Sequence, residues 1–153
     1  MKFAVRSALV AGVLSIAVLP SAFAEDKAED AVKYREALME VVGGHTQSFF
    51  ALLQGKVSHP EDLAWHADSL AEASKRVKGA FVQNTAGSGA KTEAKDGIWA
   101  AGSEFTKLAG DFETAAANLS AAVKSKDQAA IGPAAKALGG ACKGCHDEFR
   151  EKQ

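Results

Sequence analysis

The residues best suited to chemistry are five consecutive ones near the carboxyl end, Cys142-Lys143-Gly144-Cys145-His146. Two cysteines separated by two residues and followed directly by a histidine form the attachment pattern of c-type haem. On a helix, residues three apart lie on one face, so both thiols can reach the two vinyl groups along one side of a porphyrin. The motif therefore predicts one covalent haem c, with Cys142 and Cys145 as its thioether anchors and His146 as an axial ligand of the iron.

Other uses of a Cys-x-x-Cys pair fit the surrounding sequence less well. A redox-active dithiol of the thioredoxin type is expected beside a βαβ unit, and the chain shows no strand pattern. A structural zinc site needs four ligands and usually a second cysteine pair, and His45, His59 and His66 have no matching spacing. A plain structural disulfide would leave His146 without a role.

The amino-terminal segment has the pattern of an export signal. Lys2 and Arg6 precede an uncharged apolar stretch over residues 8–19, which ends at Pro20 before the small-x-small sequence Ala22-Phe23-Ala24. This stretch is shorter than the roughly 20 residues that cross a bilayer, so a cleaved signal fits better than a retained anchor. We predict a signal peptide over residues 1–24, cleavage after Ala24, and a periplasmic product.

The remaining chain, residues 25–153, has the length of one domain with a core of its own. Removing Lys2 and Arg6 from the 18 basic residues leaves 16 against 19 acidic ones, a balance of −3. A mildly acidic chain without basic clusters is unsuited to nucleic acid. No later segment is long and apolar enough to span a membrane, so we expect no membrane anchor after cleavage.

Apolar residues recur at the three- and four-residue spacing of helices in four segments. The segments run from about 26 to 54, from about 60 to 81, from about 96 to 124, and from 127 or 133 to 149. Four helices with mostly short connections predict an all-α antiparallel four-helix bundle, in which cofactors bind between facing helices. The haem is then expected near the C-terminal helix.

Two details concern the ends of these helices. Ser58 with Glu61 fits a capping box, and Pro60 fits the first turn of the second helix. Residues 84–95 are rich in glycine, serine and threonine and lack periodicity, which indicates a surface loop.

Four helices with Cys-x-x-Cys-His in the last one resemble the class II c-type cytochromes, which are the cytochrome c′ family and its low-spin, methionine-ligated relatives. The resemblance spans nearly all of residues 25–153. It rests on Arg35-Glu36-Ala37-Leu38-Met39, on Ile98-Trp99 with Phe105, and above all on the run from Leu138 to Arg150. The chain departs from the family in residues 84–95, where the common Phe-Pro-x-Gly run is missing.

The resemblance implies roles for four further residues. Arg35 falls where the family places a cation near a haem propionate, and Met39 falls where a side chain faces the empty side of the iron. Trp99 matches an aromatic residue near the haem, where it is expected to pack on the macrocycle. Arg150 is expected beside His146, where it shields the proximal face and raises the reduction potential.

Met39 leaves two outcomes open. Its sulfur could bind the iron and give a six-coordinate, low-spin centre with a raised potential. Alternatively it packs over a vacant position, which leaves a five-coordinate iron accessible to a small gas. Spacing alone would make it a core residue. His45 lies nearly two turns beyond Met39 and is expected at the edge of the core or on the surface, as are Trp65 and His66.

These observations predict a periplasmic mono-haem electron carrier, in which the haem supplies the redox chemistry and redox proteins are the partners. The acidic surface would steer the protein toward basic patches on those partners. The alternative is a five-coordinate cytochrome c′ that binds nitric oxide or carbon monoxide at the distal face. An enzyme is not expected, because peroxide chemistry would need a distal acid-base pair. The resemblance also implies a homodimer formed through the first two helices.

Overall fold

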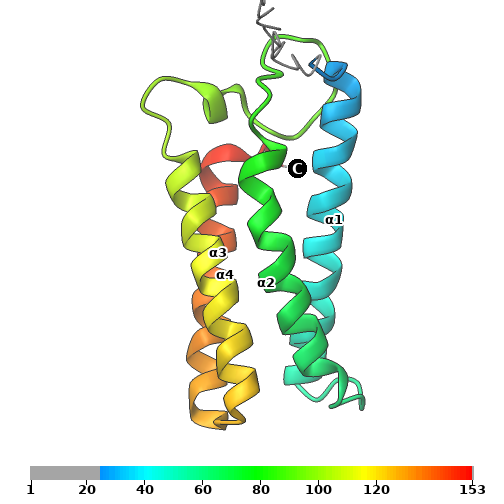
Figure 1. Cartoon of the computed structure of the whole chain (residues 1–153), viewed down its shortest axis with the longest axis vertical. Coiled ribbons are helices and arrows are strands. Elements are labelled where there is room, and N and C mark those ends of the chain that lie inside the picture. The colour runs from blue at the N-terminus through cyan, green and yellow to red at the C-terminus, as the bar shows by residue number, and fades with distance from the viewer. Residues whose placement is uncertain (1–24, 153) are drawn as a thin grey trace, which may run out of the picture.

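The computed structural model describes residues 25–152, so the predictions of a signal peptide and of cleavage after Ala24 lie outside the described part. Four long helices run side by side with alternating direction (Figure 1). They are α1 (Ala28–Leu53), α2 (Asp62–Ala80), α3 (Phe105–Ser125) and α4 (Gln128–Phe149), and a short 3-10 helix, η1 (Asp96–Trp99), precedes α3. The prediction of an antiparallel four-helix bundle is confirmed.

The helices pack in chain order, α1 against α2, α2 against α3, and α3 against α4. The first and last helices, α1 and α4, make no comparable contact with each other. A bundle closed on three sides and open on the fourth has room for a large ligand between its first and last helices.

The core lies along the contacts of α2 and α3 with their neighbours. Its largest fully buried side chains come from all four long helices: Phe49, Leu70, Leu119, Ile131 and Leu138. Burying a side chain of this size contributes about 1.5–3 kcal/mol, so this line of contacts holds the bundle together. No helix within residues 25–152 is long and apolar enough to cross a bilayer.

The third predicted helix is divided in the structure, which corrects the sequence-based prediction. Residues 96–99 form η1, and α3 begins only at Phe105. Gly102 between them has a φ of 78°, a left-handed conformation that glycine adopts freely and that cannot continue a right-handed helix. Ile98 and Phe105 are nevertheless both buried, so the apolar spacing continues across the break.

The helix ends differ in part from the predictions. The capping box does not form, because Glu61 is the N-cap of α2 and no side chain caps that end. At α4 the Asp127 side chain accepts a hydrogen bond from the Ala129 N–H at 2.9 Å, a standard N-cap. Pro133 lies inside α4. Of the two starting points left open by the sequence, the one near Asp127 is therefore the observed one.

Candidate haem site

The open side of the bundle contains a cavity of about 630 Å³, within the usual range of about 300–1,000 Å³ for ligand pockets. Helices α1 and α4 form its two facing walls, α2 and α3 form an apolar floor, and the loop before α3 closes one end. The lining includes Arg35, Met39, Gly43, Phe81, Glu93, Phe105, Cys142, Cys145, His146 and Arg150.

The α4 wall carries the attachment motif. Cys142 and Cys145 are half-buried and lie one turn apart on the face of α4 that lines the cavity. Burial raises the pKa of both thiols, so both are protonated near neutral pH. Burial also lowers the pKa of His146, and the nearby Arg150 charge lowers it further. The imidazole is therefore neutral near pH 7, the form in which histidine binds metals.

The α1 wall carries a stripe of residues four apart, Arg35, Met39, Gly43 and Gln47, all of which line the cavity. The structure thus places Met39 and His146 in the two walls of one cavity. His45 does not line the cavity; its Nδ1 lies 2.9 Å from Nδ1 of His66 on α2. The expectation that His45 stays outside the site is consistent with this contact.

Arg35 is buried, at 3% exposure, which the sequence pattern did not indicate. Its guanidinium carbon lies 5.1 Å from the ring centre of Phe81 and 5.0 Å from that of Trp99, in cation–π contact with both. Its Nη2 donates a 2.5 Å hydrogen bond to Oγ1 of Thr85. Burial lowers the pKa of Arg35, but arginine keeps its charge because its ordinary pKa is so high.

The remaining donors of Arg35 test whether the residues fit a haem. Within residues 25–152, the buried Nε and Nη1 atoms have no hydrogen-bond partner. A buried cation without a counter-charge costs several kcal/mol, and the cavity lies directly beside it. A ligand carboxylate would offset that cost, and a haem carries two of them. With the thiol pair, the neutral imidazole and the apolar floor, the cavity fits a haem.

Trp99 is placed differently from the expectation that it packs on the macrocycle. It does not line the cavity, and its ring covers Arg35 instead. Its indole N–H donates a 2.8 Å hydrogen bond to the carbonyl of Phe81, just past the end of α2. Trp99 therefore contacts Arg35, which lines the cavity, and is not itself part of the lining.

The loop of residues 81–104 contributes contacts that the sequence did not reveal. Nε and Nη2 of Arg150 lie 2.7 and 2.6 Å from Oε2 of Glu93. An isolated antiparallel bridge pairs Ala94 with Arg150, and the Lys95 N–H donates to the Phe149 carbonyl at 2.9 Å. Such pairing across more than fifty residues leaves no local signal, so the segment read only as a surface loop.

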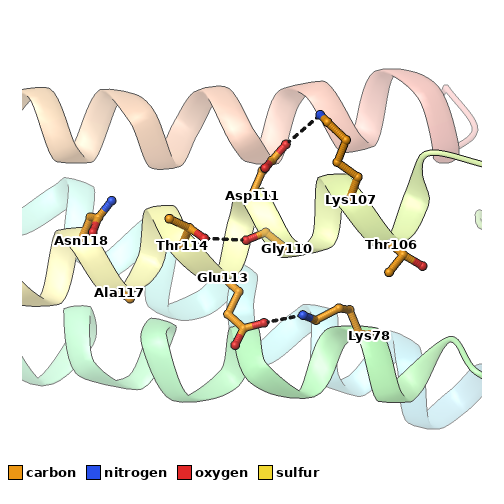
Figure 2. A pocket seen from close by; sticks show the side chains of 9 residues that line it. All are labelled: Lys78, Thr106, Lys107, Gly110, Asp111, Glu113, Thr114, Ala117 and Asn118. Atoms are coloured by element: carbon orange, nitrogen blue, oxygen red, sulfur yellow. Dashed lines mark hydrogen bonds and ion pairs between the residues drawn. The ribbon is translucent and has the colours of Figure 1, made fainter.

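A second hollow lies on the outside of the bundle, over α2 and α3 (Figure 2). It is lined by exposed polar and charged side chains, with ion pairs of 2.8 Å between Lys78 and Glu113 and of 3.2 Å between Lys107 and Asp111. No cysteine, histidine or methionine lines it. The chemistry of the motif is therefore confined to the cavity between α1 and α4.

The fold and the motif define a mono-haem c-type cytochrome built on a four-helix bundle. The family model described as cytochrome c′ matches residues 30–150. The cytochrome c′ of Pararhodospirillum photometricum is 38% identical over 120 residues, which cover 78% of this chain and 95% of the relative. The chain belongs to the cytochrome c′ family of non-enzymatic haem proteins, and Cys142 and Cys145 bind one covalent haem c.

Solved structures agree with this assignment. The crystal structure of cytochrome c′ from Rubrivivax gelatinosus superposes with a TM-score of 0.73 at 36% identity, covering 82% of this chain and 98% of that one. A ferrous variant of cytochrome c′ from Alcaligenes xylosoxidans with bound nitric oxide gives a TM-score of 0.73 at 26% identity, covering 83% and 98%. The fold is therefore shared with solved structures of this family.

Proposed function

We propose that this protein binds nitric oxide or carbon monoxide at its haem iron, on the side opposite His146. The observation that carries the proposal is the composition of the α1 wall. Met39 is its one sulfur-bearing side chain, and Gly43, one turn later, presents no side chain to the cavity. Gly43 therefore adds no bulk to the wall beside Met39, which leaves room for a diatomic ligand there. The relative with bound nitric oxide supports this choice.

The proposal gives each cavity residue a role. When bound, the haem supplies an iron that takes a diatomic ligand and exchanges one electron. Cys142 and Cys145 hold the macrocycle against α4, and His146 supplies the proximal imidazole. Met39 covers the distal side and excludes water and larger ligands without binding the iron. Arg35 pairs its two free nitrogens with a propionate.

A second candidate is the electron carrier that the sequence predicted. It requires the Met39 sulfur to bind the iron opposite His146, and it is favoured by the position of Met39 in the facing wall. Glu36 and Glu40 lie at the exposed edge of the same wall, and they would direct the haem side toward basic redox partners.

Two further proposals concern the whole chain. We propose export to the periplasm, with cleavage after Ala24, because the family is periplasmic and residues 1–24 carry the signal pattern. We also propose a homodimer through α1 and α2, where Tyr34, Val41 and Trp65 are at least half exposed. Mass spectrometry of the exported protein and sedimentation of the holoprotein test these two points.

Visible absorption spectra of the oxidised and reduced holoprotein, recorded before and after carbon monoxide is added, test the main proposal. A broad, high-spin reduced spectrum that shifts with the gas is the expected result, because the iron then has a vacant position. Sharp reduced α and β bands that ignore carbon monoxide would instead show that Met39 occupies the iron, and the electron carrier would be the correct function.

A further inference from the structure

We propose that Glu93 is a positioning residue, which fixes the Arg150 guanidinium beside His146 and thereby sets the reduction potential of the haem. The inference rests on the proposed ligation of the iron by His146. All three side chains line the cavity, Glu93 from the loop before α3 and the other two from the end of α4. No local sequence signal links Glu93 to the haem motif.

The side chains of Arg150 and Glu93 form a short ion pair with two hydrogen-bonding nitrogens. Nε and Nη2 of Arg150 both approach one carboxylate oxygen of Glu93, at 2.7 and 2.6 Å. Charge-assisted hydrogen bonds of this length are about twice as strong as neutral ones. The side chains are, however, 46% and 44% exposed, and an ion pair this accessible contributes little by itself.

The backbone supplies the order that an exposed ion pair lacks. Arg150 ends α4 in an extended conformation, with φ −114° and ψ 136°, and Ala94 pairs with it in an antiparallel bridge. The Glu151 N–H donates to the Glu93 carbonyl at 2.8 Å, and the Lys95 N–H donates to the Phe149 carbonyl at 2.9 Å. These backbone contacts hold residues 93–95 and 149–151 in register. The ion pair therefore orders the two side chains at a small entropic cost.

Arg150 lies one turn beyond the proposed proximal ligand, and both residues line the cavity. The Arg150 N–H donates to the His146 carbonyl at 3.1 Å, which places the two residues one turn apart at the end of α4. Arg150 and Glu93 carry opposite charges, and both line the cavity together with His146. Charged groups around a metal ligand tune the metal.

The charges of Glu93 and Arg150 predict in which direction the reduction potential of the haem changes when their contact is lost. Glu93 partly neutralises the cation, and a cation near the iron favours the ferrous over the ferric state. The backbone bridge keeps Arg150 at the end of α4 when the side-chain contact is lost, so its charge remains there uncompensated and raises the potential. If Glu93 changes the reduction potential through Arg150, this change must vanish when Arg150 is replaced by an uncharged residue. A direct effect of the Glu93 charge on the iron must remain in that variant.

The test measures reduction potentials of holoproteins by spectroelectrochemistry without added gas. Glu93→Gln is expected to raise the ferrous-to-ferric ratio at fixed potential about threefold, which is about 28 mV at 59 mV per tenfold for one electron. Glu93→Asp keeps the charge but draws the carboxylate back, and we expect about a twofold change in the same direction. In an Arg150→Gln background, Glu93→Asp should change nothing.

Glu148→Gln is the matched control. Glu148 is exposed, also near the end of α4, and its charge acts on Cys145, but its side chain does not contact Arg150. The proposal is overturned if Glu93→Asp behaves as wild type while Glu93→Gln merely equals Glu148→Gln, since charge alone then accounts for the shift. It is equally overturned if the Glu93→Asp shift persists in the Arg150→Gln background. Carbon monoxide spectra of the wild type test gas binding separately.

Discussion

Nη2 of Arg35 donates a 2.5 Å hydrogen bond to Oγ1 of Thr85 and so joins α1 to the loop that follows α2. The bond satisfies one end of a guanidinium that is otherwise enclosed by Phe81 and Trp99. Its Nε and Nη1 atoms remain without partners among residues 25–152. An arginine held this firmly, with two donors left over at the edge of a cavity, is prepared to bind an anion.

Replacing Arg35 therefore tests whether a haem propionate completes its contacts. We expect Arg35→Met to lower the unfolding free energy of the holoprotein by about 1.5–3 kcal/mol, the usual value of hydrogen bonds to a charged group. Urea unfolding measures this, with the exposed Arg76→Met as a control expected within about 0.5 kcal/mol. A gain in stability would contradict the assignment, because removing an uncompensated buried charge is stabilising.

Covalent attachment through Cys142 and Cys145 makes a prediction that is independent of ligation. With both replaced by alanine, the haem should separate completely from the chain in denaturing buffer, because no thioether bond remains. In the wild type essentially all of it should stay with the chain. Haem-stained denaturing gels or mass spectrometry read the result directly, and a covalent adduct in the double variant would refute the attachment sites.

The proposed role of Met39 as cover for the distal side predicts that its sulfur is dispensable to the iron. Met39→Leu, which nearly conserves volume, should leave the high-spin reduced spectrum unchanged and cost less than about 1.5 kcal/mol. The visible spectrum with and without carbon monoxide is the measurement. A change from a low-spin to a high-spin spectrum in the variant would identify Met39 as an iron ligand.

The core contacts of α3 should dominate stability, since this helix packs between α2 and α4. Leu119 is 0% exposed, and Leu119→Ala should lower the unfolding free energy by about 2–5 kcal/mol through lost burial and a residual cavity. Val82 is 79% exposed, and Val82→Ala should stay within about 0.5 kcal/mol. Equal effects in urea unfolding would contradict the packing described here.

The contact between His45 and His66 predicts a dependence of stability on pH. Burial, and then the neighbouring His66, lowers the pKa of His45 below its ordinary 6.5. The unfolded chain then binds this proton more readily, so the contribution of His45 is present above about pH 6.5 and is lost as pH falls through the folded-state value.

Urea unfolding of the wild type and of His45→Gln, compared between about pH 7.5 and 5, isolates that contribution. The difference between the two proteins is the relevant quantity, because it removes every contribution that they share. We expect stability to fall less on acidification in the variant. Parallel curves would show that the contact with His66 does not oppose protonation of His45.

Much of the architecture was predictable because its signals are local. The apolar spacing of each helix repeats within a few residues, and the attachment motif occupies little more than one turn of α4. The bundle, the cofactor class and the family follow from such short-range patterns. Met39 could be assigned to the cavity wall only by resemblance to the family. Its helical spacing is the same as that of a methionine packed in the core.

The other features depend on residues that are far apart in the chain. Four amphipathic helices and a haem-binding motif follow from the sequence alone, but it predicted one continuous helix where Gly102 divides η1 from α3. Only the folded chain brings Trp99 behind Arg35 and Glu93 to Arg150. Such contacts form once the helices have packed, and their energy depends on distances that no local pattern of residues encodes.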